Sequence, residues 1–147
     1  MNVHLQRVSP ADVDTYVALE KKRAGLKTYH ALTDTNEALQ QIKDSVNYFI
    51  LSDTTIVGSI SYKVRDVDTA EIDGVLILPD HEGMGYAKAA LNLLLKELVP
   101  FESIFLMTHP MNPRSIHLYT SVGFTEAGRV ENYFGDGEPR LKFVLNR

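Results

Sequence analysis

Two regular segments flank the glycine-rich sequence Glu82-Gly83-Met84-Gly85-Tyr86-Ala87. The apolar segment before it, residues 74–78, is typical of a strand and ends at Pro79. The segment after it, residues 88–98, is rich in Ala and Leu and predicts a helix that Pro100 ends. In such a strand–loop–helix unit, small residues let a ligand approach the backbone, and the free N–H groups of the first helical turn point at that ligand. The unit therefore predicts an anion site, most often one for phosphate or pyrophosphate.

The glycine spacing does not fit the other common phosphate-binding loops. The dinucleotide fingerprint needs Gly or Ala three positions after its second glycine, where this chain has Lys88, and it opens the first strand–helix unit of a fold. The loop of nucleotide hydrolases needs Gly-Lys-Ser/Thr, but Gly85 is followed by Tyr86. A kinase loop lies between two strands. Taken alone, the loop is equally compatible with a helix N-terminus that binds no ligand.

A second motif covers residues 112–124, Asn-Pro-Arg-Ser-Ile-His-Leu-Tyr-Thr-Ser-Val-Gly-Phe, and follows a β-rich run at residues 103–108. Asn112 is suited to cap a helix and the following proline to open it, while a glycine near the end is suited to stop it. Taken alone, Tyr119 is interpreted as a core residue, because it lies at helical spacing from Ile116 and Val122.

The two motifs together resemble those of the GNAT superfamily of acyl-CoA N-acyltransferases. The loop of that family reads Gln/Arg-x-x-Gly-x-Gly/Ala after a strand, and residues 82–87 match it except at Glu82. The later helix of the family often reads Asn-x-x-Ala/Ser, then Leu-Tyr, then Gly-Phe. The matching residues in this chain are Asn112, Ser115, Leu118-Tyr119 and Gly123-Phe124.

The order of predicted elements also fits this family. Strands are expected at residues 4–8, 48–52, 56–64, 70–78, 103–108, 124–130 and 141–145, and helices at residues 10–23, 36–45, 88–98 and 113–122. The resemblance implies a mixed α+β fold over residues 1–147 as one domain. Its central, twisted and largely antiparallel sheet would have six to seven strands, helices on both faces, and a splayed strand pair that holds acyl-CoA.

Composition narrows the class of protein. The chain has 147 residues, 44% of them hydrophobic, which suffices for one sizeable core. A net charge of −4 without a long basic run argues against a nucleic-acid partner. The absence of cysteine excludes disulfides and a thiol nucleophile. No segment has the pattern of a signal peptide or a membrane span, so we expect a soluble cytoplasmic protein with no membrane partner.

The resemblance implies acetyl-CoA as cosubstrate. Main-chain groups of Val75, Leu76 and Ile77 would pair with the pantetheine arm as if it were an added strand, and Asn112 would hydrogen-bond that arm. Glu82 stands where Gln or Arg is usual, and its side chain is expected to point to solvent because a carboxylate would repel phosphates. The implied cofactor-binding residues are Val75, Leu76, Ile77, Glu82, Gly83, Met84, Gly85, Tyr86, Ala87, Lys88, Asn112, Ser115 and Tyr119.

The implied activity is transfer of an acetyl group to a primary amine by direct attack. Tyr119 lies where the family commonly uses a tyrosine to protonate the departing sulfur. Glu71 lies in an Ala-Glu-Ile run, which resembles that of the general-base glutamate in the histone-acetylating branch. Asp73 shares its strand face and is the rival base. Solvent-facing carboxylates and a water chain without a dedicated base are the alternatives.

Several expectations concern the surroundings of this site. Glu20-Lys21-Lys22-Arg23 is interpreted as a solvated helix end, although Glu20 and Tyr29 lie in the region that borders the acceptor in the family. Residues 132–138 resemble a segment that lies beside the acceptor in some N-terminal and ribosomal-protein acetyltransferases. A hairpin with Tyr133 and Phe134 packed in the core is slightly favoured for them.

Other features limit the partners of the protein. The five histidines lack metal-ligand spacing, so no metal is expected. The acceptor is expected to be a small-molecule or peptide amine. Transfer of a longer acyl group and a non-catalytic acyl-CoA-binding module are the alternative functions. Homodimers are common in the family, and both a monomer and a homodimer fit the sequence.

Overall fold

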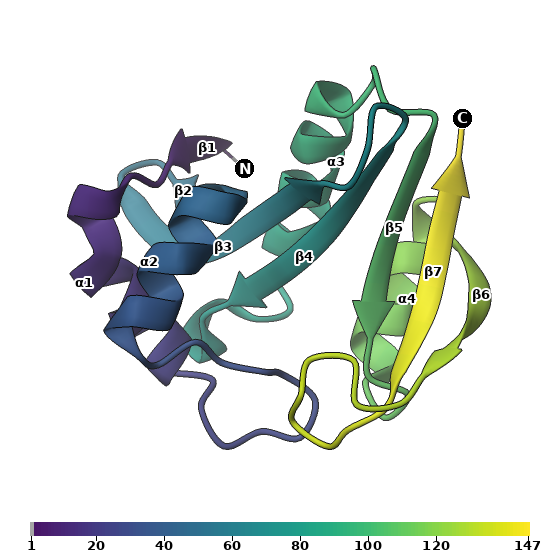
Figure 1. The fold of residues 1–147 in the computed structure, drawn as a ribbon. Coiled ribbons are helices and arrows are strands. Elements are labelled where there is room, and N and C mark those ends of the chain that lie inside the picture. The colour runs from purple at the N-terminus through teal and green to yellow at the C-terminus, as the bar shows by residue number, and fades with distance from the viewer. Residues whose placement is uncertain (1) are drawn as a thin grey trace.

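A seven-stranded sheet with helices on both faces forms the framework of the chain (Figure 1). The computed structural model describes residues 2–147. The strands are β1 Val3–Arg7, β2 Val46–Ser52, β3 Thr55–Val64, β4 Thr69–Ile77, β5 Ser103–Thr108, β6 Thr125–Val130 and β7 Arg140–Asn146. The helices are α1 Val13–Lys21, α2 Thr35–Asp44, α3 Tyr86–Glu97 and α4 Pro113–Ser121, with short 3-10 turns η1 Pro10–Asp12 and η2 Pro79–His81. The predicted mixed α+β architecture is confirmed.

The strand order is β1-β2-β3-β4-β5-β7-β6. Every neighbouring pair is antiparallel except β4 and β5, which run parallel. The α3 helix connects these two parallel strands, as a crossover of that kind requires. The segment predicted as one helix from Pro10 to Arg23 instead begins with the 3-10 turn η1 and ends its helix at Lys21.

Two separate hydrophobic clusters bury the two faces of the sheet. One face packs against α1 and α2 through a cluster that contains Val17, Ala38, Ile42 and Phe49. The other face packs against α3 and α4, and its cluster contains Ala90, Leu91 and Leu94 of α3, Leu98 directly after α3, and Tyr119 of α4. Ala90, Leu91, Leu94 and Leu98 recur at the spacing of one helical face, and all four are fully buried, which explains why this Ala/Leu-rich segment is a helix here.

The pairing of β4 with β5 stops half-way along β4. Residues 69–72 of β4 pair with residues 103–106 of β5, but β4 continues to Ile77 with β3 as its partner. Ile72 lies opposite Tyr62 and Gly74 lies opposite Ser61, so Asp73 is an extra residue that forms a bulge. Beyond this bulge the two strands diverge (Figure 1), which leaves one edge of β4 without a strand partner.

We expect Gly58→Ala to destabilise the protein by roughly 1–3 kcal/mol. A Cβ at Gly58 on β3 would overlap the main-chain carbonyl oxygen of Leu76 on β4, and a paired strand cannot move away without loss of its ladder. Gly74→Ala is the matched control, because its Cβ would meet only the side-chain oxygen of Ser61, which can rotate at the cost of its hydrogen bond to Asp73. Thermal unfolding should rank wild type first, Gly74→Ala second and Gly58→Ala last; equal midpoints for the two variants would contradict the prediction.

Candidate functional site

The predicted strand–loop–helix unit is present: β4 leads through η2 and residues 82–85 into α3, which begins at Tyr86, two residues before the predicted start. Gly83 and Gly85 have φ angles of 74° and 85°, in the left-handed region that glycine adopts readily. The first helical hydrogen bond runs from the Ala89 N–H to the Gly85 carbonyl at 3.1 Å. The N–H groups of residues 86–88 therefore have no acceptor within the helix and are available to an anion.

A cavity of about 570 Å³ lies between this loop, the unpaired edge of β4 and α4. Its wall contains all the predicted cofactor-binding residues except Met84, whose side chain lies exposed on the loop. We call it the loop cavity. The structure thus brings together residues of three elements, β4, α3 and α4, that the two sequence motifs had indicated separately.

A second cavity, of about 510 Å³, lies on the side of α1 and α2. Its wall includes Glu20 of α1, Glu71 and Asp73 of β4, and Tyr133 and Phe134 of the β6–β7 connection, and we call it the acidic cavity after these carboxylates. The wall also contains three basic residues: Arg65 and Arg140, which are paired with Glu71 and Asp136, and Lys63. Both cavities share one wall, formed by Thr28, Tyr29, Val75, Asn112, Ser115 and Tyr119. A ligand in either cavity therefore reaches the same side chains of α4.

Tyr119 belongs to both the core and the site. It is 7% exposed, packs within the α3–α4 cluster, and meets Phe124 edge-on with ring centroids 6.1 Å apart. Its hydroxyl makes no hydrogen bond with another group of residues 2–147, and burial raises the pKa of that phenol well above its ordinary value. The core interpretation of the ring is therefore confirmed, and the protonated hydroxyl lies in the shared wall, where its catalytic role stays a prediction.

Asn112 fixes the start of α4. Its side-chain oxygen accepts a hydrogen bond from the Ser115 N–H at 3.2 Å, and Pro113 occupies the first helical position. This cap uses only the oxygen of the Asn112 side chain. The amide NH₂ group of Asn112 therefore remains as a donor in the wall that both cavities share.

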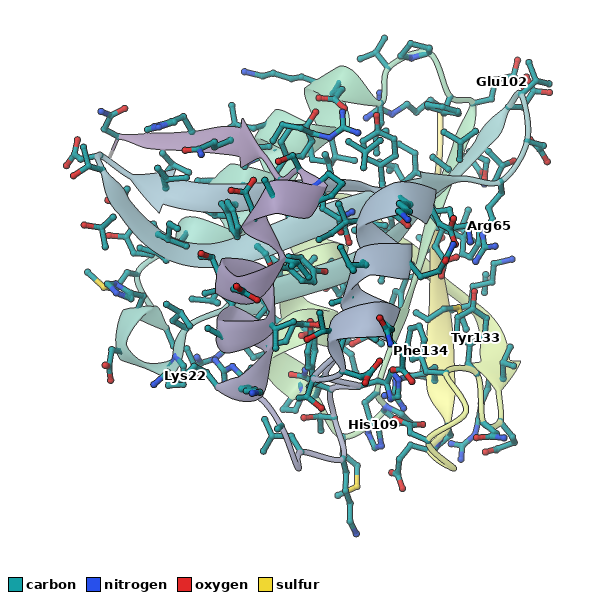
Figure 2. The ribbon with its side chains drawn as sticks, turned by 60° about the vertical axis from the view of Figure 1, so that its left-hand side comes forward. Lys22, Arg65, Glu102, His109, Tyr133 and Phe134 are labelled. Atoms are coloured by element: carbon teal, nitrogen blue, oxygen red, sulfur yellow. The ribbon has the colours of Figure 1, made fainter. Side chains whose placement is uncertain are left out.

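Glu71 is held on both of its oxygens. The side chain is 1% exposed; Arg65, in the β3–β4 turn, donates to Oε1 from Nε at 2.8 Å, and the Tyr133 hydroxyl donates to Oε2 at 2.9 Å. Figure 2 shows Arg65 and Tyr133 on the same side of the molecule. Burial and the neighbouring Glu71 carboxylate raise the pKa of Tyr133 to about 12, so its hydroxyl stays a donor at neutral pH. Sequence reasoning found Glu71 but neither of its partners.

Asp73 lies at the bulge of β4 with three donors around it. Its Oδ1 accepts from the Ser61 hydroxyl at 2.6 Å, and its Oδ2 accepts from the Ser45 hydroxyl at 2.8 Å and from the Gln41 amide at 3.1 Å. These bonds join β4 to β3 and α2. Asp73 and Glu71 line the same cavity, and the role of either as a base stays a prediction.

The sequence model of the acetyltransferase (GNAT) family matches residues 16–124, which is more than half of the chain. The chain belongs to the GNAT family of acetyltransferases. The matched range contains the glycine loop, α4 and the whole wall that the two cavities share.

Comparisons with individual proteins agree with this family. A spermidine N(1)-acetyltransferase of Vibrio cholerae is 34% identical over 67 residues, a segment that covers 43% of this chain and 39% of that protein. The ribosomal-protein-S18-alanine N-acetyltransferase of Escherichia coli superposes with a TM-score of 0.81 at 20% identity, over 99% of this chain and 94% of that one. A ribosomal L7/L12 alpha-N-protein acetyltransferase in complex with coenzyme A superposes with a TM-score of 0.82 at 15% identity, over the same shares. These two structures show the shared fold.

Glu82 departs from the GNAT loop pattern; the residue is exposed, as predicted, but its carboxylate is also paired with two arginines, which the sequence did not indicate. Its Oε2 accepts from Arg114 Nη1 at 2.7 Å, and its Oε1 accepts from Arg23. Arg23 also donates from Nε to the Ile77 carbonyl at 3.0 Å. The sequence gives no local signal for this cluster, because Arg23 and Arg114 are far from Glu82 along the chain.

Glu20 is not part of a solvated helix end in this GNAT protein. It is 2% exposed, and it accepts from the Tyr29 hydroxyl at 2.6 Å and from the Leu32 N–H at 3.2 Å, both in the α1–α2 connection. The connection folds back over the end of α1, which buries Glu20 and leaves Lys21 and Lys22 exposed. Tyr16, one turn earlier, is buried on the same side, and this i, i+4 pair was the available sequence signal.

The segment of residues 132–138 forms the predicted hairpin, but its aromatic residues do not pack in the core. Tyr133 and Phe134 are half-buried in the wall of the acidic cavity. Phe134 stacks on His30 of the α1–α2 connection, with ring planes 5° apart, so the two connections meet beside this cavity (Figure 1). The expectation of core packing is therefore corrected, because both connections fold toward the open half of β4.

His109 is buried, its Nδ1 accepts from the Met111 N–H at 3.0 Å, and its Nε2 therefore carries the proton that faces Glu138 at 2.8 Å. Across residues 2–147, no group of three or more His, Asp or Glu side chains is arranged to hold a metal ion. In the same residues, every helix is too short or too polar to cross a membrane.

We expect Glu20→Gln to gain stability relative to wild type as the pH rises. Burial raises the pKa of the Glu20 carboxyl above its ordinary value of 4.5, so the folded state binds this proton more tightly than the unfolded chain does. Wild-type stability therefore falls, relative to Glu20→Gln, as the pH rises from the ordinary carboxyl pKa through the raised one. Urea denaturation from acidic to neutral pH measures the difference, and Glu126→Gln on exposed β6 controls for the loss of one charge. A pH-independent difference would contradict the prediction.

Proposed function

We propose that this GNAT protein transfers an acetyl group from acetyl-CoA to a primary amine. The observation that carries the proposal is the shared wall at Tyr119, where the loop cavity and the acidic cavity meet. One cavity has donors for phosphate, and the other has carboxylates for a cationic amine. A reaction that joins the two ligands needs both, with the reacting atoms at the shared wall.

The residues of the loop cavity fit the cosubstrate. Free N–H groups at the start of α3, together with the Lys88 side chain, are suited to the pyrophosphate. The edge of β4 from Val75 to Ile77 has no neighbouring strand on the side of β5, and it is suited to pair with the amides of an extended pantetheine arm. The free NH₂ group of Asn112 supplies a further donor beside this arm.

The proposed reaction is a direct attack of the amine on the thioester, so the protein itself forms no covalent bond to the acetyl group. The thioester, when bound, supplies an already reactive carbonyl carbon. The amine nitrogen forms the new C–N bond as the C–S bond breaks, and the Tyr119 hydroxyl gives its proton to the sulfur. The phenolate regains a proton from the nitrogen, which loses one as the amide forms. A hydroxyl that burial keeps protonated and that has no competing partner is suited to this role.

The amine must first lose its ammonium proton, and we propose Glu71 for this step with Asp73 as its rival. Both carboxylates border the acidic cavity, which supports either one. The oxygens of Glu71 are held by Arg65 and Tyr133, and those of Asp73 by three neutral donors. A water chain that ends in this cavity is the alternative route for the proton.

The acceptor is proposed to be a cationic amine, either a small molecule or a peptide. The buried Glu20 and the bulge residue Asp73 face the acidic cavity without an ion-pair partner in residues 2–147, and Tyr133 and Phe134 give it an aromatic side. The relative from Vibrio cholerae is named for acetylation of spermidine, a cationic amine, which agrees with this class. The ion pairs of Glu82 weaken the sequence argument for a non-catalytic module, because its charge is already balanced.

A thiol-release assay tests the proposal directly. The purified protein, with acetyl-CoA and a panel of polyamines, peptide N-termini, lysine peptides and small amines, should release free CoA thiol with at least one amine class. Propionyl-CoA and succinyl-CoA arms measure acyl preference, and faster turnover with either would favour the longer-acyl alternative. Acetyl-CoA should also raise the melting temperature. A protein that no acyl-CoA stabilises would contradict the proposal.

We expect Tyr119→Phe to lower kcat by roughly ten- to a thousandfold, the range for loss of an acid or of a transition-state donor. The ring that packs on Phe124 remains, so the melting temperature should change little. Binding of acetyl-CoA should be nearly unchanged, because the thioester sulfur is a poor acceptor before the bond breaks. The measurement is kcat under conditions where chemistry limits turnover. If the variant keeps the wild-type kcat, Tyr119 takes no part in the chemistry. If the variant fails to fold, the hydroxyl is needed by the core.

A further inference from the structure

A carboxylate joins two arginines at the phosphate end of the loop cavity. Glu82 precedes the glycine loop, Arg23 follows α1, and Arg114 lies in the first turn of α4. Each arginine binds one oxygen of Glu82, and all three residues line the cavity. The three side chains are contributed by three parts of the chain that surround the proposed position of the pyrophosphate.

The cluster keeps a positive charge and unused donors. Two guanidinium groups and one carboxylate sum to a net charge of about +1 at neutral pH. A guanidinium has five N–H donors in a fixed fork. Arg114 binds Glu82 through Nη1 and is 69% exposed, so its other donors remain open to a ligand. Arg23 is 20% exposed and is fixed by its second bond, to the Ile77 carbonyl at the end of β4.

Two physical effects of Glu82 on a bound phosphate oppose each other. As a lone negative charge it would repel the phosphate, and its replacement by a neutral residue would strengthen binding. As the common partner of two long, flexible cations it restricts their rotamers before the ligand arrives, so less side-chain entropy is lost on binding. The double ion pair favours the second effect, because the charge of Glu82 is already more than balanced.

We propose that Glu82 is a positioning residue that holds Arg23 and Arg114 as a pair of phosphate-binding side chains at the mouth of the loop cavity. The basic side chain that position 82 lacks is thus supplied by Arg23 and Arg114, from parts of the chain that are distant from the loop in sequence. The bond from Arg23 to Ile77 also ties this pair to the β4 edge that would receive the pantetheine arm. The proposal rests on the proposed use of the loop cavity for acyl-CoA.

Binding measurements on three single variants test the pair. Calorimetry with CoA should show about tenfold weaker affinity for Arg114→Gln, the loss expected for one charge-assisted hydrogen bond. Glu82→Gln should also bind CoA several-fold more weakly, although it removes a negative charge from the phosphate site. Arg129→Gln is the matched control, because Arg129 pairs with Glu131 at the end of β6 and lines neither cavity.

A ligand without phosphate distinguishes a positioning role of Glu82 from a general loss of structure in the variants. Pantetheine, which carries no phosphate, is titrated by NMR as a second ligand, and its affinity should be equal in wild type, Arg114→Gln and Glu82→Gln. The dependence of CoA affinity on salt concentration should be shallower in Arg114→Gln than in wild type, because one phosphate contact is lost. In the double variant, the two losses should be less than additive, since Glu82 acts through Arg114.

Three results would overturn the proposal. Tighter CoA binding by Glu82→Gln would show that the carboxylate only repels the phosphates. Equal losses for CoA and pantetheine would show a structural role unrelated to phosphate. If wild type binds CoA and Arg114→Gln binds it equally tightly, the arginine pair has no role in phosphate binding, although the proposed function stands. A wild-type protein that binds no CoA would instead refute the proposed function, and the pair with it.

Discussion

The end of the β4–β5 pairing at Ile72 is the constraint on which the rest of the structure depends. A sheet edge inside a fold normally pairs with another strand, since unpaired main-chain groups are unfavourable. Here the bulge at Asp73 turns β4 away, and bonds from Ser45, Gln41 and Ser61 hold this residue in place. The two cavities lie where the strands separate, and the half-buried Asp73 carboxylate anchors the bulge at this point to β3 and α2.

Sequence reasoning succeeded where the signal was local. The glycine loop, the capped helix α4 and the alternation of strands with helices are each encoded within a short stretch of chain. They predicted the order of elements, and all the predicted cofactor-binding residues except Met84 line the loop cavity. Helical spacing also placed Tyr119 in the core, and the structure adds that the same residue borders both cavities.

The errors concern contacts between residues that are distant along the chain. Glu20 was expected in solvent because its neighbours are basic, yet the α1–α2 connection covers it. Glu82 was expected in solvent because its carboxylate would repel the phosphates; it is exposed, but the pairing with Arg23 and Arg114, from two other elements, was missed. Tyr133 and Phe134 were expected in the core because hairpins often pack there, yet they face a cavity whose position depends on the divergence of β4 and β5. A single sequence does not indicate which residues distant along the chain come into contact.

The wall that the two cavities share has a thermodynamic consequence. Tyr29, Val75, Asn112, Ser115 and Tyr119 contribute to both cavities, so any displacement of these side chains by one ligand also reshapes the volume offered to the other. Coupling of this kind is reciprocal: the factor by which the first ligand alters the affinity for the second equals the factor for the reverse order. Under the proposed function, binding in one cavity would therefore alter the affinity of the other cavity for its ligand, without any moving domain.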